Sequence, residues 1–184
     1  MKVAADIIAL IEGQPDMMRL LRVVERLSLP DCWIGAGFVR NAVWDVLHDR
    51  APDCAALNDV DVVFFDAVEA SRRRDDAIEG KLRLTCPGVP WSVSNQARMH
   101  AQNNDDPYTD VGGAVARWPE TATAVAVRFV SGRVELLAPH GVDDLVNLVV
   151  RPTPAFVARR DVFDERLRTK AWLSRWPRLT VLTA

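Results

Sequence analysis

Residues 31–66 read DCWIGAGFVRNAVWDVLHDRAPDCAALNDVDVVFFD, and this stretch contains the pattern that decides the fold. A short apolar run, Cys32–Ile34, stops at Gly35-Ala36-Gly37, where two residues without a Cβ permit positive φ and close approach of a ligand to the backbone. Apolar residues then recur at helical spacing, which predicts a helix with one buried face formed by Phe38, Val39, Ala42, Val43, Val46 and Leu47. The N-terminus of this helix opens from the glycine turn, so its unpaired N–H groups suit a phosphate.

The second half of the stretch places two carboxylates at the start of a strand. Val60–Phe65 is β-branched or aromatic almost throughout and predicts a buried strand. Because side chains alternate along a strand, Asp59 and Asp61 share one face, roughly 6–7 Å apart. Their mutual repulsion is relieved by a hard divalent cation such as Mg²⁺ or Mn²⁺. A phosphate cradle beside metal-binding carboxylates indicates nucleotide chemistry.

The order of these motifs resembles the signature of the nucleotidyltransferase superfamily, which has the polymerase beta fold. Phe38-Val39-Arg40-Asn41 is similar to the G-x-V-R-D run of tRNA nucleotidyltransferases. Over nearly the whole chain, longer segments resemble a family of small bacterial nucleotidyltransferase-like proteins: WIGAGFVRN, NDVDVVFFD, WSVSNQARMH, WPETATAV and KAWLSRWPRL. Two features depart from the superfamily pattern. Ala36 replaces a glycine, and Gly37 stands 22 positions before Asp59 because of an insertion in the polar loop 49–58.

The resemblance implies an enzyme that transfers a nucleoside monophosphate from an NTP to an acceptor and releases pyrophosphate. Asp59 and Asp61 would be catalytic metal ligands, and two-metal chemistry requires a third carboxylate. Residues 121–123 and 133–136 are similar to the segment of tRNA nucleotidyltransferases that supplies it, which makes Glu135 the candidate. The acceptor, the nucleotide base and the oligomeric state stay open.

The resemblance also implies the phosphate contacts. Gly35 and Gly37 would cradle the β- and γ-phosphates, with Arg40 either touching them or supporting the turn from behind. An alternative from another class is a catalytically silent module on the same fold that binds a nucleotide or a protein partner. Glycine turns and Asp-x-Asp each occur by chance, but two acids at the start of a buried strand are costly without a cation and so favour catalysis.

Glu135 has a competing structural interpretation. Residues 121–130 and 133–138 predict a hairpin joined by Ser131-Gly132. With a two-residue turn, Arg128 lies opposite Glu135 and pairs with it across the strands. The sequence is compatible with both roles of Glu135, as a third metal ligand and as the partner of Arg128.

The composition limits the classes of protein to which this chain can belong. The 184 residues are 49% hydrophobic, with 23 basic against 25 acidic side chains and a net charge of −2, so no overall basic field attracts nucleic acid. No apolar run approaches membrane-spanning length. Cys32, Cys54 and Cys86 lack metal spacing and predict reduced thiols in a cytoplasmic protein. We expect one domain over 1–184, with N-terminal helices in 1–30, a catalytic core in 31–150 and a C-terminal helix in 151–184.

The predicted fold class is α/β (α+β), with a small mixed sheet flanked by helices. The strands are Cys32–Ile34, Val60–Phe65, Trp91–Asn95 and the hairpin. Besides the helix after the glycine turn, the pattern predicts helices over Val3–Ile11, Met17–Leu27 with Asp16 as N-cap, Ala67–Lys81, Thr109–Trp118, Gly141–Val149 and Ala155–Ser174.

Several further polar residues have a structural explanation that we favour. Arg72-Arg73-Arg74 is neutralised by nearby acids and predicts a solvated helix face. His100 has no second metal ligand nearby. Arg98 is different, because its NQARMH stretch is prominent in the resembled family, which implies a role at the rim of the active site. The excess of basic residues between Arg159 and Arg178 could face a triphosphate or an acceptor, but an exposed face of a terminal helix is favoured.

Overall fold

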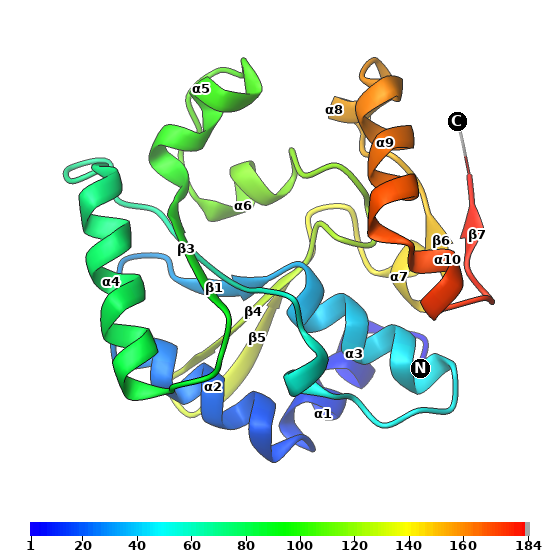
Figure 1. Ribbon diagram of the computed structural model, residues 1–184, viewed down its shortest axis with the longest axis horizontal. Coiled ribbons are helices and arrows are strands. Elements are labelled where there is room, and N and C mark those ends of the chain that lie inside the picture. Colours follow the sequence, from blue (N-terminus) through cyan, green and yellow to red (C-terminus); the bar gives the residue numbers. More distant parts are fainter. Residues whose placement is uncertain (183–184) are drawn as a thin grey trace.

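A five-stranded sheet forms the centre of the molecule in the computed structural model, which describes residues 1–182 (Figure 1). The strand order is β3-β2-β1-β4-β5. β2 runs parallel to β3, and the other neighbouring pairs in this sheet are antiparallel, so the predicted mixed sheet is confirmed. The strands are β1 Trp33–Gly35, β2 Val60–Phe64, β3 Trp91–Asn95, β4 Ala126–Val130 and β5 Arg133–Leu137.

The first three helices cover one face of this sheet and bury the main core: α1 Ala4–Glu12, α2 Pro15–Glu25 and α3 Gly37–Leu47. Ile34, Val62 and Val127 face these helices and are fully buried. α2 begins at Pro15 with Gln14 as its N-cap, so the predicted N-cap at Asp16 is wrong. Proline fits the first helical position because its missing N–H has no partner to lose there.

A smaller cluster lies on the opposite face. Trp33, Val63 and Ala126 pack there against Val111 and Val115 of α6 (Val111–Val115). α6 is shorter than the predicted helix 109–118, because Asp110 caps it by accepting a hydrogen bond from the Gly113 N–H at 2.7 Å. Side chains alternate in β2, so Asp61 lies on this second face together with Val63. The helices of the main core therefore leave the Asp61 side of the sheet accessible.

Helix α4 (Arg72–Thr85) covers β3, which is an edge strand, and begins after its N-cap Ser71 rather than at Ala67. Two carboxylates of α4 accept hydrogen bonds from outward-facing N–H groups of β3. Glu79 Oε2 binds the Val93 N–H at 3.2 Å, and Asp75 Oδ2 binds the Asn95 N–H at 3.0 Å. The edge is thus satisfied by side chains, which removes a template for pairing with another strand.

The hairpin has the predicted turn and register. Arg128 lies opposite Glu135, and Ser131 and Gly132 both have positive φ, 50° and 82°, as a two-residue hairpin turn requires. The first strand is shorter than predicted, because residues 121–125 form turns and β4 begins only at Ala126.

The C-terminal part is broken into short elements: α7 Asp143–Val146, β6 Val149–Val150, α8 Pro154–Val157, α9 Arg160–Lys170, α10 Trp172–Arg175 and β7 Thr180–Val181. The prediction of one helix over Ala155–Ser174 is therefore wrong. Ala171 has a left-handed backbone, with φ 48°, which ends α9 and turns the chain into α10. In Figure 1, α9 and α5 (Met99–Asn103) stand at the same end of the molecule, with α6 between them.

The helices described in residues 1–182 include none that is long and apolar enough to cross a membrane. Cys32, Cys54 and Cys86 are free thiols, in agreement with the absence of a predicted disulfide.

Candidate nucleotide-binding and catalytic site

The two predicted metal ligands lie where β2 begins. Asp59 immediately precedes β2, and Asp61 is in register with Gly35 of β1 and Ser92 of β3. The pKa of Asp61 is raised to about 6, first by burial and then by the negative charge of Asp59. A hydrogen bond from the Ser92 hydroxyl offsets part of this rise. The negative charge of Asp59 therefore opposes ionisation of Asp61, and a divalent cation bound between the two carboxylates would relieve this repulsion.

The turn before α3 is held in an uncommon conformation, but at a residue that is not a glycine. Ala36 has φ 51° and ψ −119° and acts as the N-cap of α3. Its N–H donates to the Val125 carbonyl at 2.9 Å, while its own carbonyl accepts from the Val39 and Arg40 N–H groups. The expectation that the two glycines adopt the positive φ is therefore wrong.

Gly35 and Gly37 have different roles. A Cβ on Gly35 would lie 2.5 Å from Cη2 of Trp118, so this glycine makes room for an indole rather than for phosphate. At Gly37 a Cβ would meet only side-chain atoms of Arg40 and Asn41, at 3.6 Å or more, which is ordinary contact. The protein itself thus tolerates a side chain at Gly37. Any need for glycine there would come from a ligand.

A cleft of about 230 Å³ joins Asp61, the second of the two carboxylates, to this turn. Asp61 and Ala36 lie in its wall, together with Thr123 and with Arg166 of α9. The N-terminus of α3 opens beside Ala36, so one hollow contains a carboxylate, a helix N-terminus and a cation. This combination suits a metal-bound polyphosphate.

Arg40 supports the turn from behind and does not line the cleft. Its side chain is 7% exposed and donates to Thr123 Oγ1 at 2.9 Å and to Asn41 Oδ1 at 2.8 Å. Its guanidinium stacks on the rings of Trp44 and Trp172, with 5.2 and 4.6 Å to the ring centroids. Burial lowers the pKa of Arg40 to about 10, while the charges of Glu120, Asp59 and Asp61 act in the opposite direction. Of the two predicted roles for Arg40, this geometry fits support.

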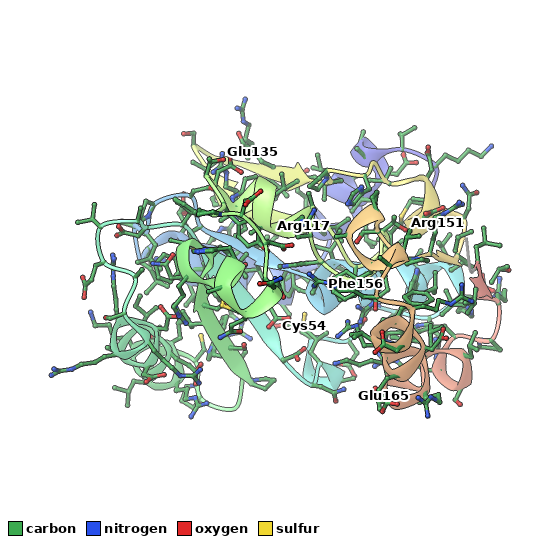
Figure 2. The ribbon with its side chains drawn as sticks, turned by 90° about the horizontal axis from the view of Figure 1, so that it is seen from above. Cys54, Arg117, Glu135, Arg151, Phe156 and Glu165 are labelled. Atoms are coloured by element: carbon green, nitrogen blue, oxygen red, sulfur yellow. The ribbon has the colours of Figure 1, made fainter. Side chains whose placement is uncertain are left out.

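The structure does not bring Glu135 to the carboxylate pair. Glu135 is on β5, and two strands, β1 and β4, separate β5 from β2, which places it roughly 14 Å or more from Asp61. Its carboxylate accepts from Arg128 at 2.8 and 2.9 Å and from Arg133 at 2.8 and 3.2 Å. These arginines, Arg128 first, lower the pKa of Glu135. Figure 2 shows Glu135 at the opposite margin of the molecule from Glu165 of α9. We correct the assignment: Glu135 is a structural acid of the hairpin.

Within residues 1–182, no group of three or more His, Cys, Asp and Glu side chains is placed to hold a metal ion. Asp59 and Asp61 therefore form a pair and not a closed cage. Mg²⁺ is commonly held by one or two carboxylates, with waters and substrate phosphates completing its shell, so the pair still fits such an ion.

Sequence reasoning missed three residues around the cleft. Glu120 is fully buried and forms a two-pronged ion pair with Arg166, at 2.7 and 3.2 Å. Thr123 anchors Arg40, as described above. Glu120 and Thr123 belong to the WPETATAV segment, and Arg166 belongs to α9. The WPETATAV motif was the available signal for Glu120 and Thr123, because it is one of the segments that carry the family resemblance.

The other polar candidates are used within the fold. Arg98 forms an ion pair with the buried Asp75, and His100 Nδ1 lies 3.0 Å from the Ala97 carbonyl oxygen. Arg74 pairs with Asp66, and Arg72 lies 3.9 Å from Asp76. Asp144 pairs with Arg151 at 3.0 Å.

Comparisons with known proteins agree with this geometry. Residues 22–181 match the nucleotidyltransferase family. A solved structure described as revealing a CCA-adding enzyme head domain is 34% identical, with a TM-score of 0.89 and coverage of 100% of this chain and 98% of that one. No curated protein matches this chain.

More distant structures share the fold alone. The CCA-adding enzyme of Thermotoga maritima complexed with tRNA is 15% identical, with a TM-score of 0.59 over 98% of this chain. A CCA-adding enzyme in complex with CTP is 15% identical, with a TM-score of 0.58 over 99% of this chain. The chain spans 42% and 43% of those two proteins. The strand-turn-helix unit, the following Asp-x-Asp strand and the family match lead to one conclusion: the chain belongs to the nucleotidyltransferase family.

Proposed function

We propose that this protein transfers a nucleoside monophosphate from a metal-bound NTP to an acceptor hydroxyl and releases pyrophosphate. The observation that carries the proposal is that Asp61, whose pKa is raised to about 6 by burial and by the neighbouring charge of Asp59, lies in one cleft with Ala36 at the N-terminus of α3. Such a pair favours a divalent cation, Mg²⁺ or Mn²⁺, and the helix terminus favours phosphate.

The chain's own residues would orient the reactants. Asp59 and Asp61 would hold the ion, which neutralises charge on the phosphates when bound. The N–H groups of Gly37 and Phe38 at the start of α3 would face the outer phosphates. The acceptor oxygen then attacks the α-phosphorus, the bond to the bridging oxygen breaks, and pyrophosphate leaves with that electron pair while the hydroxyl proton passes to water. Arg40 keeps the turn in place by holding Thr123.

The acceptor is not defined by these residues. Two of the distant structures are complexes with CTP and with ATP, so these are the first nucleotides to test. The tRNA complex of a distant relative makes an RNA end one candidate acceptor, beside protein and small-molecule hydroxyls.

The metal-ligand assignment is tested with Asp61→Asn and Asp59→Asn. We expect both variants to fold and to lose Mg²⁺-dependent binding of ATP or CTP, because a hard anionic ligand is removed. Turnover should fall by roughly two orders of magnitude or more, equivalent to about 2.7 kcal/mol of barrier. Calorimetric titration with and without Mg²⁺ measures the affinity, and release of pyrophosphate measures turnover. Glu135→Gln is the control, and wild-type affinity in both Asp variants would contradict the assignment.

The phosphate cradle is tested with Gly37→Ala, because the protein has room for this Cβ. The variant should keep its stability and lose nucleotide affinity, since the methyl group occupies the mouth of α3. Gly80→Ala in α4 is the matched control, because no atom lies within 4 Å of the added Cβ there. If Gly37→Ala binds Mg²⁺-ATP as tightly as wild type does, the phosphate binds elsewhere.

A second candidate function is nucleotide binding without turnover. It is favoured by one observation, that the described residues bring no third carboxylate to Asp59 and Asp61. The two functions are separated by single-turnover assays with labelled CTP and ATP over a panel of acceptors. Tight Mg²⁺-NTP binding with no pyrophosphate released from any acceptor would favour silent binding.

A further inference from the structure

Helix α9 is fixed to the cleft by a buried ion pair. Arg166 donates from Nε and Nη2 to the two carboxylate oxygens of Glu120, which has no exposed surface. A two-pronged arginine–carboxylate pair fixes both partners in direction as well as in position. Because Arg166 also lines the cleft with Asp61, α9 forms one of its walls.

The end of α9 is fixed a second time, by the chain that follows it. Trp172 is 4% exposed and lies edge-on to Trp44 of α3, with ring centroids 5.8 Å apart. The same indole stacks on the guanidinium of Arg40. The last turn of α9 is therefore held beside the first turns of α3, where the proposed phosphate cradle opens.

Lys170 lies in this last turn and differs from the other cations of the helix. It stands four residues after Arg166, so the two side chains share one face of α9. Arg160, Arg166 and Arg168 each pair with an acid, Asp164, Glu120 and Glu165 respectively. Lys170 is exposed and has no ion-pair partner among residues 1–182.

We propose that Lys170 binds the polyphosphate of the nucleotide, in a subsite on α9 that Arg166 and Glu120 hold in place opposite the carboxylate pair. The inference rests on the proposed function. It adds to the nucleotide site a residue of α9, outside the motifs on β1, α3 and β2. The ligand class is a triphosphate or its inorganic equivalent, and not the base or the sugar.

The electrostatics of the cleft agree with this assignment. Arg166 lines the cleft together with Asp61, and Lys170 stands one turn further along the same face of α9, so the ammonium is on the α9 side and the Asp61 carboxylate on the β2 side. A triphosphate with its metal ion would lie between the carboxylates of Asp59 and Asp61 and the ammonium of Lys170. Lysine suits such a position, because its ammonium is a mobile point charge on a flexible stem that can follow the phosphate.

The test uses Lys170→Gln in the full chain, because Lys170 is exposed and its replacement leaves no buried partner uncompensated. Calorimetry in Mg²⁺ measures the affinities for ATP and for inorganic tripolyphosphate. We expect Lys170→Gln to weaken both ligands about tenfold, because a charge-assisted contact to phosphate is lost from each. Lys170→Arg should recover most of the loss. Arg168→Gln, which removes a cation of the same helix that is paired to Glu165, should leave both affinities unchanged.

The outcomes separate this inference from the function on which it rests. If wild type binds Mg²⁺-ATP and Lys170→Gln binds it equally well, the inference is overturned and the proposed function stands. A loss for ATP with wild-type affinity for tripolyphosphate would show a contact to the base or sugar and would also overturn it. If wild type binds neither ligand in Mg²⁺, the proposed function fails and this subsite fails with it. An equal loss in Arg168→Gln would show a general effect of charge and would count against a specific site.

Discussion

Ala36 adopts a backbone conformation that is unfavourable for a residue with a Cβ. Its φ of 51° with ψ of −119° lies in a region that glycine adopts readily and other residues rarely. Holding a residue with a Cβ there costs about 1–3 kcal/mol, and the surrounding hydrogen bonds from Ala36 N–H to Val125 and from Arg40 N–H to Ala36 maintain it.

We therefore predict that Ala36→Gly stabilises the protein. Glycine relieves the backbone strain of this conformation. Its greater freedom in the unfolded chain costs about 0.4–1 kcal/mol, so we expect a net gain in the free energy of unfolding of about 1 kcal/mol. Urea unfolding of the two proteins measures the difference. A loss of stability in Ala36→Gly would mean that the turn is not strained by its side chain.

Asp61 gives stability a defined dependence on pH. Its pKa is about 6 in the folded protein and 3.8 as the ordinary value, so between these values the folded state holds more protons than the unfolded state. Stability therefore falls as pH rises through this window, and the full cost is present above about pH 6. Asp61→Asn avoids this cost, because its side chain is neutral at every pH.

We expect Asp61→Asn to be more stable than wild type by about 3 kcal/mol above about pH 7, and to match it below about pH 4. Denaturant unfolding across this range, in chelator to remove divalent ions, provides the measurement. A constant difference at all pH values would indicate a packing effect instead of the titration of Asp61.

At the scale of single residues, the sequence predicted where Asp59 and Asp61 lie on the backbone, but it did not predict the conformation of the turn Gly35-Ala36-Gly37. Alternation in a strand is a local rule, so Asp59 and Asp61 could be placed on one face from the sequence alone. The positive φ falls on Ala36, while Gly35 leaves room for the indole of Trp118, which is distant in sequence. A local sequence pattern cannot show a contact between residues so far apart in the chain.

The hairpin β4–β5 contains Glu135, for which two interpretations follow from the sequence: a metal ligand or the cross-strand partner of Arg128. Its register confirms Arg128 opposite Glu135, and Arg128 also stacks on Trp33 with 4.1 Å to the ring centroid. Glu135, which is partly exposed, bridges Arg128 and Arg133 and is an acid of this surface network.

Glu135→Gln should therefore cost about 0.5–1 kcal/mol of stability and leave Mg²⁺-NTP binding unchanged, since a partly exposed ion pair contributes no more than this. The pKa of Glu135 is lowered from 4.5, so its stabilisation is present above that value and is lost as pH falls below it. The difference between wild type and variant should thus disappear in acid. Loss of metal-dependent nucleotide binding in Glu135→Gln would return it to the active site.

Among the longer elements, the sequence predicted those whose apolar pattern is strong. α1, α2, α3 and the five strands of the sheet lie within a few residues of their predicted positions, apart from the late start of β4. The C-terminal helix failed because its break at Ala171 is imposed by tertiary contacts: Trp172 packs on Trp44 and Arg40, and no glycine or proline marks the turn.

For the whole molecule, the sequence predicted a mixed sheet but not the order of its strands. That order affects the candidate site, because it places β5 three strands from β2 and so keeps Glu135 away from Asp61. The ion pair between Glu120 and Arg166 joins residues 46 positions apart. Such a pair follows from how the C-terminal elements fold back over the sheet, which no local pattern encodes.

The contact between the C-terminal elements and α3 also gives the protein an optical signal of its own. The indoles of Trp44, Trp172 and Trp176 lie edge to face, with centroids 5.8 Å apart for Trp44 and Trp172 and 5.1 Å for Trp44 and Trp176. Transitions of rings held this close in a fixed chiral arrangement couple, and they produce circular dichroism that vanishes when the rings separate. Undocking of α10 from α3 would thus be visible in the unlabelled protein, because its spectrum reports whether the segment next to Lys170 is in place.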